Sequence, residues 1–329
     1  MNRFGPDTKC VVTGGLGFIG SHFIDRALLS GWKIVNIDKV NYASLNIDFN
    51  KHPNYSHLQE DISEIGDIPY CDLLVNFAAE SHVDNSIEGA GIFVKSNFMG
   101  VFNLLEIIKR HKHQNAAKSW PYTPPLFIQA STDEVFGDIL AGGFSEDDRF
   151  KPSNPYSATK GAAEQLIVAW GRTYGLPYLI TRTTNNYGPR QHPEKLLPMA
   201  ICKCLRNEKL IIHGNGEYAR NWIHVEDNVD AINLVIQKGQ IGEAYHIASA
   251  DEFNVKQICE KVLQKFGKTY DICNINNSLD RSGADVRYAL NTSKIEALGW
   301  KSKRRLDDEL EGIVAYFKDN MERCAKVKQ

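Results

Sequence analysis

The decisive stretch of the sequence is VVTGGLGFIG, residues 11–20, an apolar run that leads into glycines at positions 14, 17 and 20. The apolar run predicts a buried strand, and the residues after Gly20 predict a helix. Gly14 allows the tight turn between the two elements, Gly17 lets the backbone approach a ligand, and Gly20 lets helix and strand pack closely. Because a helix N-terminus attracts negative charge, the turn predicts a pyrophosphate site, although similar turns without a ligand also exist.

An acidic residue at the end of the next predicted strand supports the dinucleotide interpretation. Asp38 stands eighteen residues after Gly20, where a carboxylate accepts hydrogen bonds from both hydroxyls of an adenosine ribose. Such a carboxylate repels the 2′-phosphate of NADP, so we expect NAD as the cofactor. Asp61 and Ile62 are expected to flank the adenine, with a helix cap as the alternative role for Asp61.

Short apolar segments alternate with longer helical ones in the first half of the chain, which is typical of a parallel sheet with crossover helices. We therefore predict an α/β fold, a Rossmann-type doubly wound parallel sheet with a smaller C-terminal α/β domain. Strands are predicted at 9–13, 33–38, 57–61, 72–78, 126–131 and 177–181, and helices at 21–30, 89–113 and 155–174.

The pattern loosens after Tyr187, which predicts a domain boundary there. Residues 1–187 are expected to bind NAD and residues 188–329 to bind the substrate. Residues 221–248 have strand, helix and strand character again and are expected to return to the main sheet. Helices of the second part are predicted at 195–207, 226–237, 255–266 and 306–322.

Composition excludes several classes of function. The 329 residues carry 38 Lys and Arg against 40 Asp and Glu, a net charge of −2, which argues against bulk electrostatic binding of nucleic acid. The uncharged stretches are shorter than the ~20 apolar residues that a membrane span needs. The seven cysteines are interpreted as core residues in a reducing compartment, which predicts a cytoplasmic protein, and Cys202 and Cys204 as buried residues of a chain without a metal site.

A tyrosine and a lysine are candidates for acid–base chemistry. Tyr156 and Lys160 are four residues apart in a predicted helix, so they share one face. A phenol with a pKa of ~10 is a poor base, but a nearby ammonium and a cationic nicotinamide both favour the phenolate. The same spacing occurs by chance in many helices, and it is the preceding dinucleotide motif that favours a catalytic role.

Two adjacent carboxylates end the strand before that helix. Thr132, Asp133 and Glu134 lie at the carboxyl edge of the predicted sheet, where ligands bind in such folds. Two acids this close can hold different protonation states, as removal of a proton and loss of water from adjacent carbons require. The alternative is an aspartate that caps a loop beside a solvated glutamate.

Together with the first motif, several others occur in an order that resembles the nucleotide-sugar 4,6-dehydratases of the extended short-chain dehydrogenase/reductase type, along nearly the whole chain. They are AAESHVD at 78–84, STDEVFG at 131–137, NPY at 154–156, NNYGP at 185–189, PEKL at 193–196, residues 214–221, and DR at 280–281. The resemblance implies a homodimer that pairs helices 89–113 and 155–174, and a lyase that recycles NAD. It favours dTDP-glucose as the substrate, with UDP-glucose or UDP-N-acetylglucosamine as alternatives.

The resemblance also implies roles for individual residues. Tyr156 takes the C4 hydroxyl proton, with Thr132 beside the C4 oxygen. Glu134 removes the C5 proton and Asp133 protonates the departing C6 hydroxyl. The remaining cofactor contacts fall to Phe18, Ile19, Ala78 and Ala79, and the substrate contacts to Ser81, His82, Asn186, Lys195, Leu196, Arg220, Asn254 and Arg281, of which Asn186, Arg220, Asn254 and Arg281 hold the diphosphate.

One departure from the family pattern leaves the nucleotide base open. Ala284 stands where the bacterial dTDP-glucose enzymes usually have a histidine that approaches the nucleotide. A 4-epimerase or decarboxylase of the same fold is a rival, but neither needs Asp133 followed by Glu134. A non-catalytic NAD-binding protein is a more distant alternative, and such a protein need not retain Tyr156.

Overall fold

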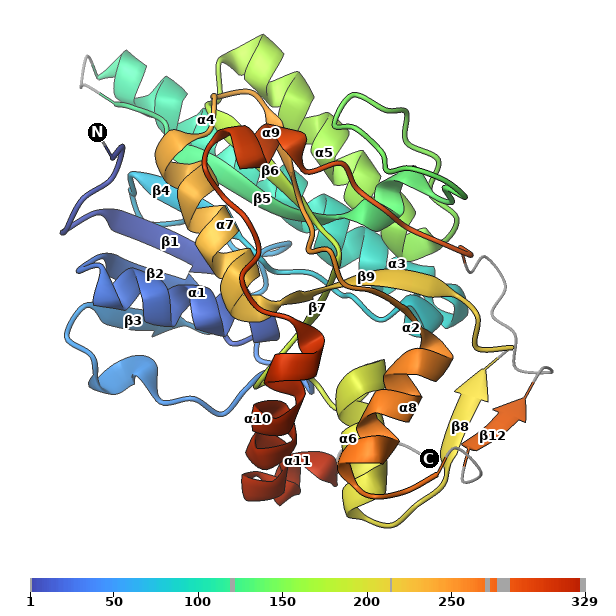
Figure 1. Cartoon of the computed structure of the whole chain (residues 1–329). Coiled ribbons are helices and arrows are strands. Elements are labelled where there is room, and N and C mark those ends of the chain that lie inside the picture. The colour runs from blue at the N-terminus through green and yellow to red at the C-terminus, as the bar shows by residue number, and fades with distance from the viewer. Residues whose placement is uncertain (1, 119–121, 214, 270–272, 277–284, 326–329) are drawn as a thin grey trace.

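The computed structural model describes residues 2–118, 122–213, 215–269, 273–276 and 285–325. At its centre lies a seven-stranded sheet in the order β10-β6-β5-β4-β1-β2-β3, and all of its neighbouring strands are parallel (Figure 1). The strand order reverses between β1 and β4, which makes their carboxyl ends the expected ligand site. The strands are β1 (Lys9–Thr13), β2 (Lys33–Ile37), β3 (Tyr55–Leu58), β4 (Leu73–Asn76), β5 (Leu126–Thr132), β6 (Tyr178–Thr183) and β10 (Ala244–Ile247). The predicted Rossmann-type sheet is therefore confirmed.

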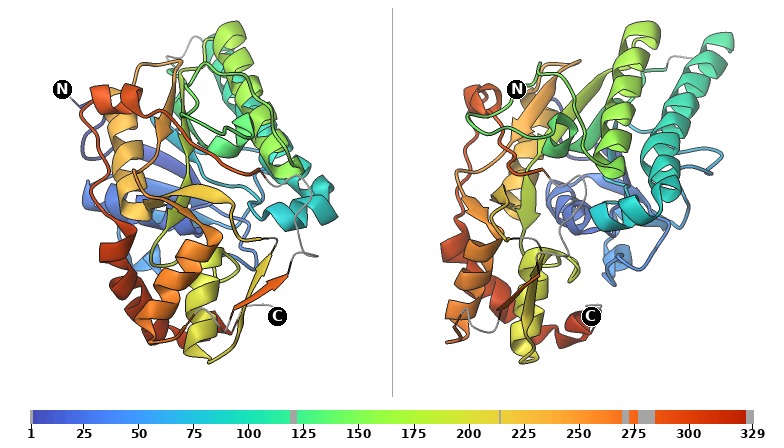
Figure 2. Two further views of the ribbon diagram at one scale, coloured as in Figure 1. Left: turned by 45° about the vertical axis from the view of Figure 1, so that its right-hand side comes forward. Right: turned by 90° about the vertical axis from the view of Figure 1, so that its right-hand side faces the viewer.

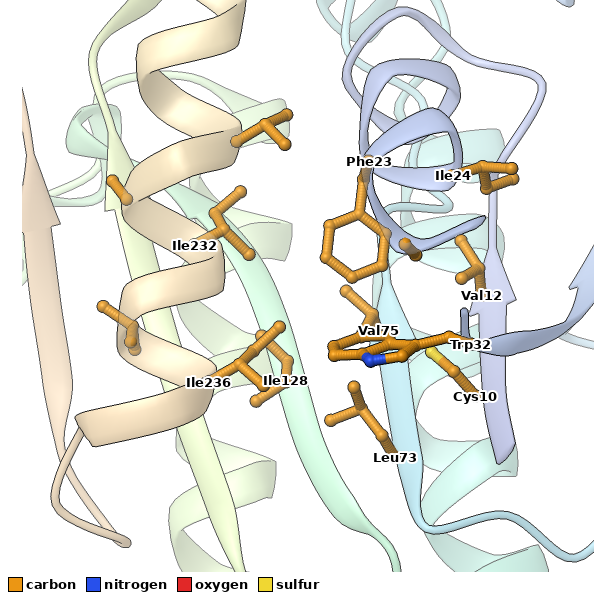
Figure 3. Packing of buried hydrophobic residues seen from close by; sticks show 14 of the residues in the cluster. Cys10, Val12, Phe23, Ile24, Trp32, Leu73, Val75, Ile128, Ile232 and Ile236 are labelled. Carbon is orange, nitrogen blue, oxygen red and sulfur yellow. The ribbon is translucent and has the colours of Figure 1, made fainter. Parts of the chain in front are cut away.

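Helices cover both faces of the sheet (Figure 2). On one face lie α1 (Phe18–Leu29) and α7 (Val225–Lys238), whose side chains meet over β4 and β5 (Figure 3). On the other lie α4 (Gly100–Ala117) and α5 (Pro155–Tyr174), which bury their apolar faces against β1, β4 and β5. Because both faces are covered, these strands are continuous apolar runs, which is why the sequence revealed them.

The predicted helix 89–113 is not uniform. After α2 (Val83–Glu88), it consists of α3 (Ala90–Phe93), a π-helical segment η2 (Val94–Met99) and then α4. Within the described part of the chain, this stretch, Ala90–Ala117, is the one helix long and apolar enough to cross a membrane. Half of its most apolar part is buried inside the protein. It packs on the sheet and α5 as a core helix.

The second part of the chain builds two small sheets and a group of helices. One sheet has the order β11-β9-β7 and the other pairs β12 with β8. Of the segment 221–248, β10 joins the main sheet and α7 covers it, whereas β9 pairs with β7 and β11 instead. The elements are β7 (Asn185–Tyr187), α6 (Leu196–Leu205), β8 (Leu210–His213), β9 (Ala219–His224), β11 (Glu252–Asn254), α8 (Val255–Lys265), β12 (Cys273–Asn276), α9 (Ser293–Ala297), α10 (Leu306–Asp319) and α11 (Met321–Cys324).

A disulfide joins Cys202 of α6 to Cys324 of α11, with Cα atoms 5.1 Å apart. The interpretation of all seven cysteines as thiols of a reducing compartment is therefore wrong for this pair. The two residues are 122 positions apart, and only the tertiary fold, which brings α11 against α6, reveals the pairing. The cytoplasmic location, which rested on that interpretation, stays a prediction.

Candidate active site

A cavity of about 500 Å³ lies at the carboxyl edge of the main sheet and extends to β7, α6 and β9. Most of the residues that the sequence singled out line it together. Three do not: Asp133 lies just behind the wall, Asn254 lies elsewhere, and Arg281 is outside the described residues. The lining includes Gly14, Gly17, Phe18, Ile19, Gly20, Asp38, Asp61, Ile62, Ala78, Ala79, Ser81, His82, Thr132, Glu134, Tyr156, Lys160, Asn186, Lys195, Leu196 and Arg220.

The glycine turn fits a dinucleotide pyrophosphate. Gly14 has φ +69°, and a Cβ there would lie 2.6 Å from the backbone nitrogen of Ala78. A Cβ on Gly20 would overlap the carbonyl oxygen of Gly14, so helix and turn need that glycine to pack. A Cβ on Gly17 would lie 3.1 Å from the carbonyl oxygen of Gly14 and would otherwise point toward open space, and Gly17 lines the cavity. The N-cap residue of α1 is Gly17, which has no side chain to cap the helix, so the first N–H groups are available to an anion.

Asp38 presents a fixed carboxylate to the same cavity. Its Oδ2 accepts the backbone N–H of Leu16 at 2.9 Å and its Oδ1 that of Val40 at 2.9 Å, and the residue is buried. These two bonds hold the carboxylate at the end of β2, where it can accept ribose hydroxyls. Asp61 lines the cavity and also accepts the N–H and the hydroxyl of Ser63 at 2.9 and 2.8 Å, so it has a capping role as well.

The start of α5 positions Tyr156. Asn154 and Ser157 form a capping box, and a proline occupies the first turn, so the helix start is firmly fixed. Burial raises the pKa of Tyr156, the Glu134 carboxylate raises it further, and a hydrogen bond with Thr132 opposes both. The protein alone therefore favours the neutral phenol, and the positive charge of a nicotinamide is needed to favour the phenolate.

Lys160 lies one turn further along α5, on the same face. Its Nζ donates to the carbonyl oxygen of Ala130 at 2.7 Å, which anchors it against β5. Burial lowers the pKa of Lys160 to about 8, although Glu164 opposes this shift. The ammonium is thus close to its titration range at neutral pH and can exchange a proton readily.

The two adjacent acids differ in their surroundings. Asp133 is only 3% exposed, and burial raises its pKa to about 8, with the Glu134 charge adding and Arg220 opposing. Asp133 therefore carries a proton at neutral pH. Burial also raises the pKa of Glu134. Three groups oppose this shift: Asn154, whose Nδ2 donates to the carboxylate at 3.3 Å, and the charges of Arg220 and Lys195. The site thus holds an acid beside a proton acceptor.

The alternative reading of the acids does not fit this geometry. Thr132, rather than Asp133, caps the 3-10 helix η3 (Asp133–Phe136) by accepting the N–H of Glu134 at 3.3 Å. Asp133 is buried behind the cavity wall, and Glu134 faces the cavity rather than open solvent. Neither side chain has the solvated position that a simple loop cap would give it.

Sequence reasoning missed Tyr288, which lines the cavity opposite Glu134. Its hydroxyl lies 2.5 Å from Asp285 Oδ2 and 3.4 Å from Glu134 Oε2, and Ser153 donates to the other oxygen of Asp285. The guanidinium of Arg220 stacks 4.3 Å above the Tyr288 ring. The contacts of Tyr288 with Glu134 and of Asp285 with Ser153 join segments more than a hundred residues apart, and no local pattern marks them.

The predicted substrate residues are held in different ways. Arg220 donates to the carbonyl oxygen of Asp285 at 2.7 Å, and Lys195 to that of Ser81 at 2.9 Å. The amide nitrogen of Asn186 donates within the protein, to Thr183 Oγ1 and the Thr184 carbonyl oxygen at 3.0 Å each, and its Oδ1 is buried without a hydrogen-bond partner among the described residues.

Two further predicted residues act as helix caps. His82 caps α2 by accepting the N–H of Asn85, and it lines the cavity. Asn254 caps α8 in a capping box with Gln257, and its amide donates to Glu217 at 3.1 Å. With its side chain engaged in this way outside the cavity wall, the structure does not bring Asn254 to the diphosphate position predicted from the sequence.

A doubly wound sheet with this glycine turn and a Tyr156–Lys160 helix at its carboxyl edge defines the extended short-chain dehydrogenase/reductases. The family model described as GDP-mannose 4,6 dehydratase matches residues 11–312. The chain therefore belongs to the nucleotide-sugar 4,6-dehydratase family of hydro-lyases.

Its relatives match over nearly their full length. The low-salt glycan biosynthesis protein Agl12 of Haloferax volcanii is 42% identical over 93% of this chain and 97% of that protein. The dTDP-glucose 4,6-dehydratase of Haemophilus influenzae is 39% identical over 93% and 97%. The crystal structure of DesIV, a dTDP-glucose 4,6-dehydratase from Streptomyces venezuelae with NAD bound, is similar with a TM-score of 0.88, at 34% identity over 95% and 98% of the two chains.

Proposed function

We propose that the protein binds NAD and converts a nucleoside-diphosphate glucose, foremost dTDP-glucose, to its 4-keto-6-deoxy derivative with loss of water. The observation that carries this proposal is the pair of adjacent acids beside Tyr156: Asp133 is buried, with its pKa raised to about 8, and Glu134 lines the cavity. An epimerase needs the tyrosine and the cofactor but has no step for this pair.

The residues support an oxidation at C4. NAD, when bound between the glycine turn and Tyr156, supplies a hydride acceptor for C4 and a hydride donor for C6, so the net redox change is zero. Tyr156 accepts the C4 hydroxyl proton as the ketone forms, and Thr132 is placed to hydrogen-bond the same oxygen. Lys160, held on Ala130, adds positive charge on the same helix face.

The same cavity supports the elimination. The C4 ketone acidifies the C5–H bond, and Glu134, which lines the cavity, takes that proton. The neighbouring buried acid, Asp133, is the source of the proton with which the C6 hydroxyl departs as water. The C5–C6 double bond formed in this step is later reduced at C6, and a proton returns to C5. Arg220 and Lys195 lie close enough to lower the pKa of Glu134, and both suit an anionic diphosphate nearby.

We expect dTDP-glucose and UDP-glucose both to be dehydrated, with kcat/KM values within about a hundredfold of each other, because the two bases differ by one methyl group that commands ~1–3 kcal/mol. Several relatives are dTDP-glucose 4,6-dehydratases, whereas the glycan biosynthesis protein Agl12 is named for no substrate, so the family alone leaves the base open. Our prediction of a weak thymine preference rests on Ala284, which replaces the usual histidine near the nucleotide. Ala284 lies outside the described residues.

The test incubates the protein with NAD and, separately, dTDP-glucose, UDP-glucose and UDP-N-acetylglucosamine, and measures the 4-keto-6-deoxy product, which absorbs in strong alkali. Formation of a C4 epimer without that product would overturn the dehydratase assignment. A preference far above a hundredfold would leave dehydration in place but would show that other residues read the base.

We also propose a homodimer through α3, η2, α4 and α5. Of the apolar residues of the predicted helix 89–113, Phe93, Val101, Leu105 and Ile108 are buried within the protomer, whereas Ile92 is 53% exposed. Val94 and Met99 of η2 are exposed as well, so this helical stretch leaves apolar side chains available to a partner protomer. Light scattering at micromolar concentration should give twice the chain mass of 37.0 kDa, and a monomer mass would refute the proposal.

A further inference from the structure

The loop after β2 ties the two sides of the cavity together. Residues 39 and 41–44 line the cavity, and the Nζ of Lys39 lies 2.6 Å from Glu80 Oε1 and 3.1 Å from Ser96 Oγ. Glu80 follows β4, and Ser96 belongs to η2. Lys39 therefore connects the carboxyl end of β2 with that of β4.

This connection spans the glycine turn. In the sheet, β1 lies between β2 and β4, so an ion pair from the end of β2 to the end of β4 passes over the end of β1, where the glycine turn begins. The turn leads into α1, on one face of the sheet, whereas Ser96 lies on the helical stretch that covers the other face. A dinucleotide on the glycine turn would be enclosed between α1 and the Lys39–Glu80 pair.

The Glu80 side of the pair is braced by the π-helical segment. Asn97 accepts the backbone N–H of Glu80 at 2.8 Å and donates to its carbonyl oxygen at 3.0 Å. The same amide donates to Thr159 of α5 at 3.1 Å. With side chains 30% and 12% exposed, Lys39 and Glu80 attract each other with less solvent screening than a surface pair.

The Lys39 side of the pair is held in a strained conformation. Val40 has φ +54°, a conformation that is unfavourable for a β-branched residue and persists only where the surroundings enforce it. Here the Asp38 carboxylate holds the Val40 N–H, and the Lys39 ion pair holds the preceding residue. Such strain is common in segments that clamp a ligand.

The far end of the loop is fastened to the second part of the chain. The hydroxyl of Tyr42 donates to Glu194 Oε2 at 3.2 Å, and its ring meets that of His192 edge to face at 5.4 Å. The loop is thus tied to β4 and η2 on one side and to the segment before α6 on the other.

We propose that Lys39 and Glu80 form a latch that retains the dinucleotide in the cavity throughout the catalytic cycle. The proposal rests on the proposed function, in which the hydride taken from C4 must return to C6 of the same sugar molecule. Release of the reduced cofactor before that return would strand the oxidised sugar. A latch that slows cofactor release without contacting the reacting carbons prevents this loss.

The test measures exchange of NAD on the purified holoenzyme without substrate, by diluting protein loaded with isotope-labelled NAD into excess unlabelled NAD. Lys39→Met, which keeps the aliphatic stem, and Glu80→Gln are each expected to speed NAD dissociation about tenfold or more. Because both break the same contact, the double variant should be no faster than the faster single variant. Lys33→Met, which breaks an exposed ion pair with Asp7, serves as the matched control and should exchange at the wild-type rate.

The double variant separates the latch from a direct contact. If Lys39 only attracted the cofactor phosphates, Lys39→Met would speed release while Glu80→Gln would not, and that result would overturn the proposal. Wild-type exchange rates in both single variants, or additive effects in the double variant, would overturn it as well. A wild-type protein that retains no labelled NAD would also overturn the latch. The proposed function fails only if no 4-keto-6-deoxy product forms when NAD is supplied, so the two failures are distinguishable.

Discussion

Replacing Tyr156 by phenylalanine is expected to lower kcat/KM about 10³-fold, within the 10²–10⁴ range that a positioned acid or base contributes. The substitution removes one oxygen atom and keeps the ring, which packs edge to face on Phe93 at 6.4 Å. In the proposed first step the Tyr156 phenolate accepts the C4 proton, so without it neither reduced nicotinamide nor keto sugar should form at an appreciable rate.

The measurement is a single turnover of NAD-loaded protein with sugar nucleotide, followed by the absorbance of reduced nicotinamide. Tyr316→Phe removes the same oxygen from a partly buried tyrosine of α10, in the second part of the chain, and should leave the trace unchanged. If Tyr156→Phe oxidised the sugar at more than a tenth of the wild-type rate, another group would have to accept the C4 proton.

Elements with clear local signals could be predicted from the sequence. The helix 155–174 matches α5 residue for residue because Asn154 and Pro155 mark its start and Gly175, at φ +68°, ends it. The prediction misplaced the edge strand β3, which spans Tyr55–Leu58 rather than 57–61. An edge strand buries few side chains, so its apolar pattern is weak.

The site was predicted as far as its residues lie at strand ends or helix starts. Thr132, Glu134 and Tyr156 meet because β5 and α5 place them at one edge of the sheet. Tyr288 and Asp285 reach the same point from the far end of the chain, with no regular element to mark their positions. Tertiary contacts of this kind leave no periodic signal in the sequence.

The protonation states could not be predicted from residue types alone. Two adjacent acids look equivalent in the sequence, and burial behind the cavity wall makes Asp133 the one that keeps a proton at neutral pH. The same burial gives Tyr156 a raised pKa, so the expected help from Lys160 is not enough by itself. Depth within the fold therefore distinguishes two acids that the motif leaves equivalent.

Replacing Glu134 by glutamine is expected to lower product formation about 10³-fold or more while C4 oxidation continues. Glutamine keeps the shape of the side chain, so Asn154 and Tyr288 retain a partner, but it cannot accept the C5 proton. The Glu134 carboxylate is also the second largest cause, after burial, of the raised pKa of Tyr156. Removing this charge therefore lowers the pKa of Tyr156 and favours the phenolate that accepts the proton, so the first step should not slow.

The two steps then separate in one experiment. After rapid mixing with sugar nucleotide, Glu134→Gln should accumulate bound reduced nicotinamide without the alkali-absorbing product, whereas Tyr156→Phe should form neither. Glu106→Gln, which neutralises a glutamate paired with Lys109 on α4, is the matched control and should leave both signals at wild-type size. Equal loss of both signals in Glu134→Gln would mean that this glutamate supports the architecture of the site, and Asp133 would then have to act without it.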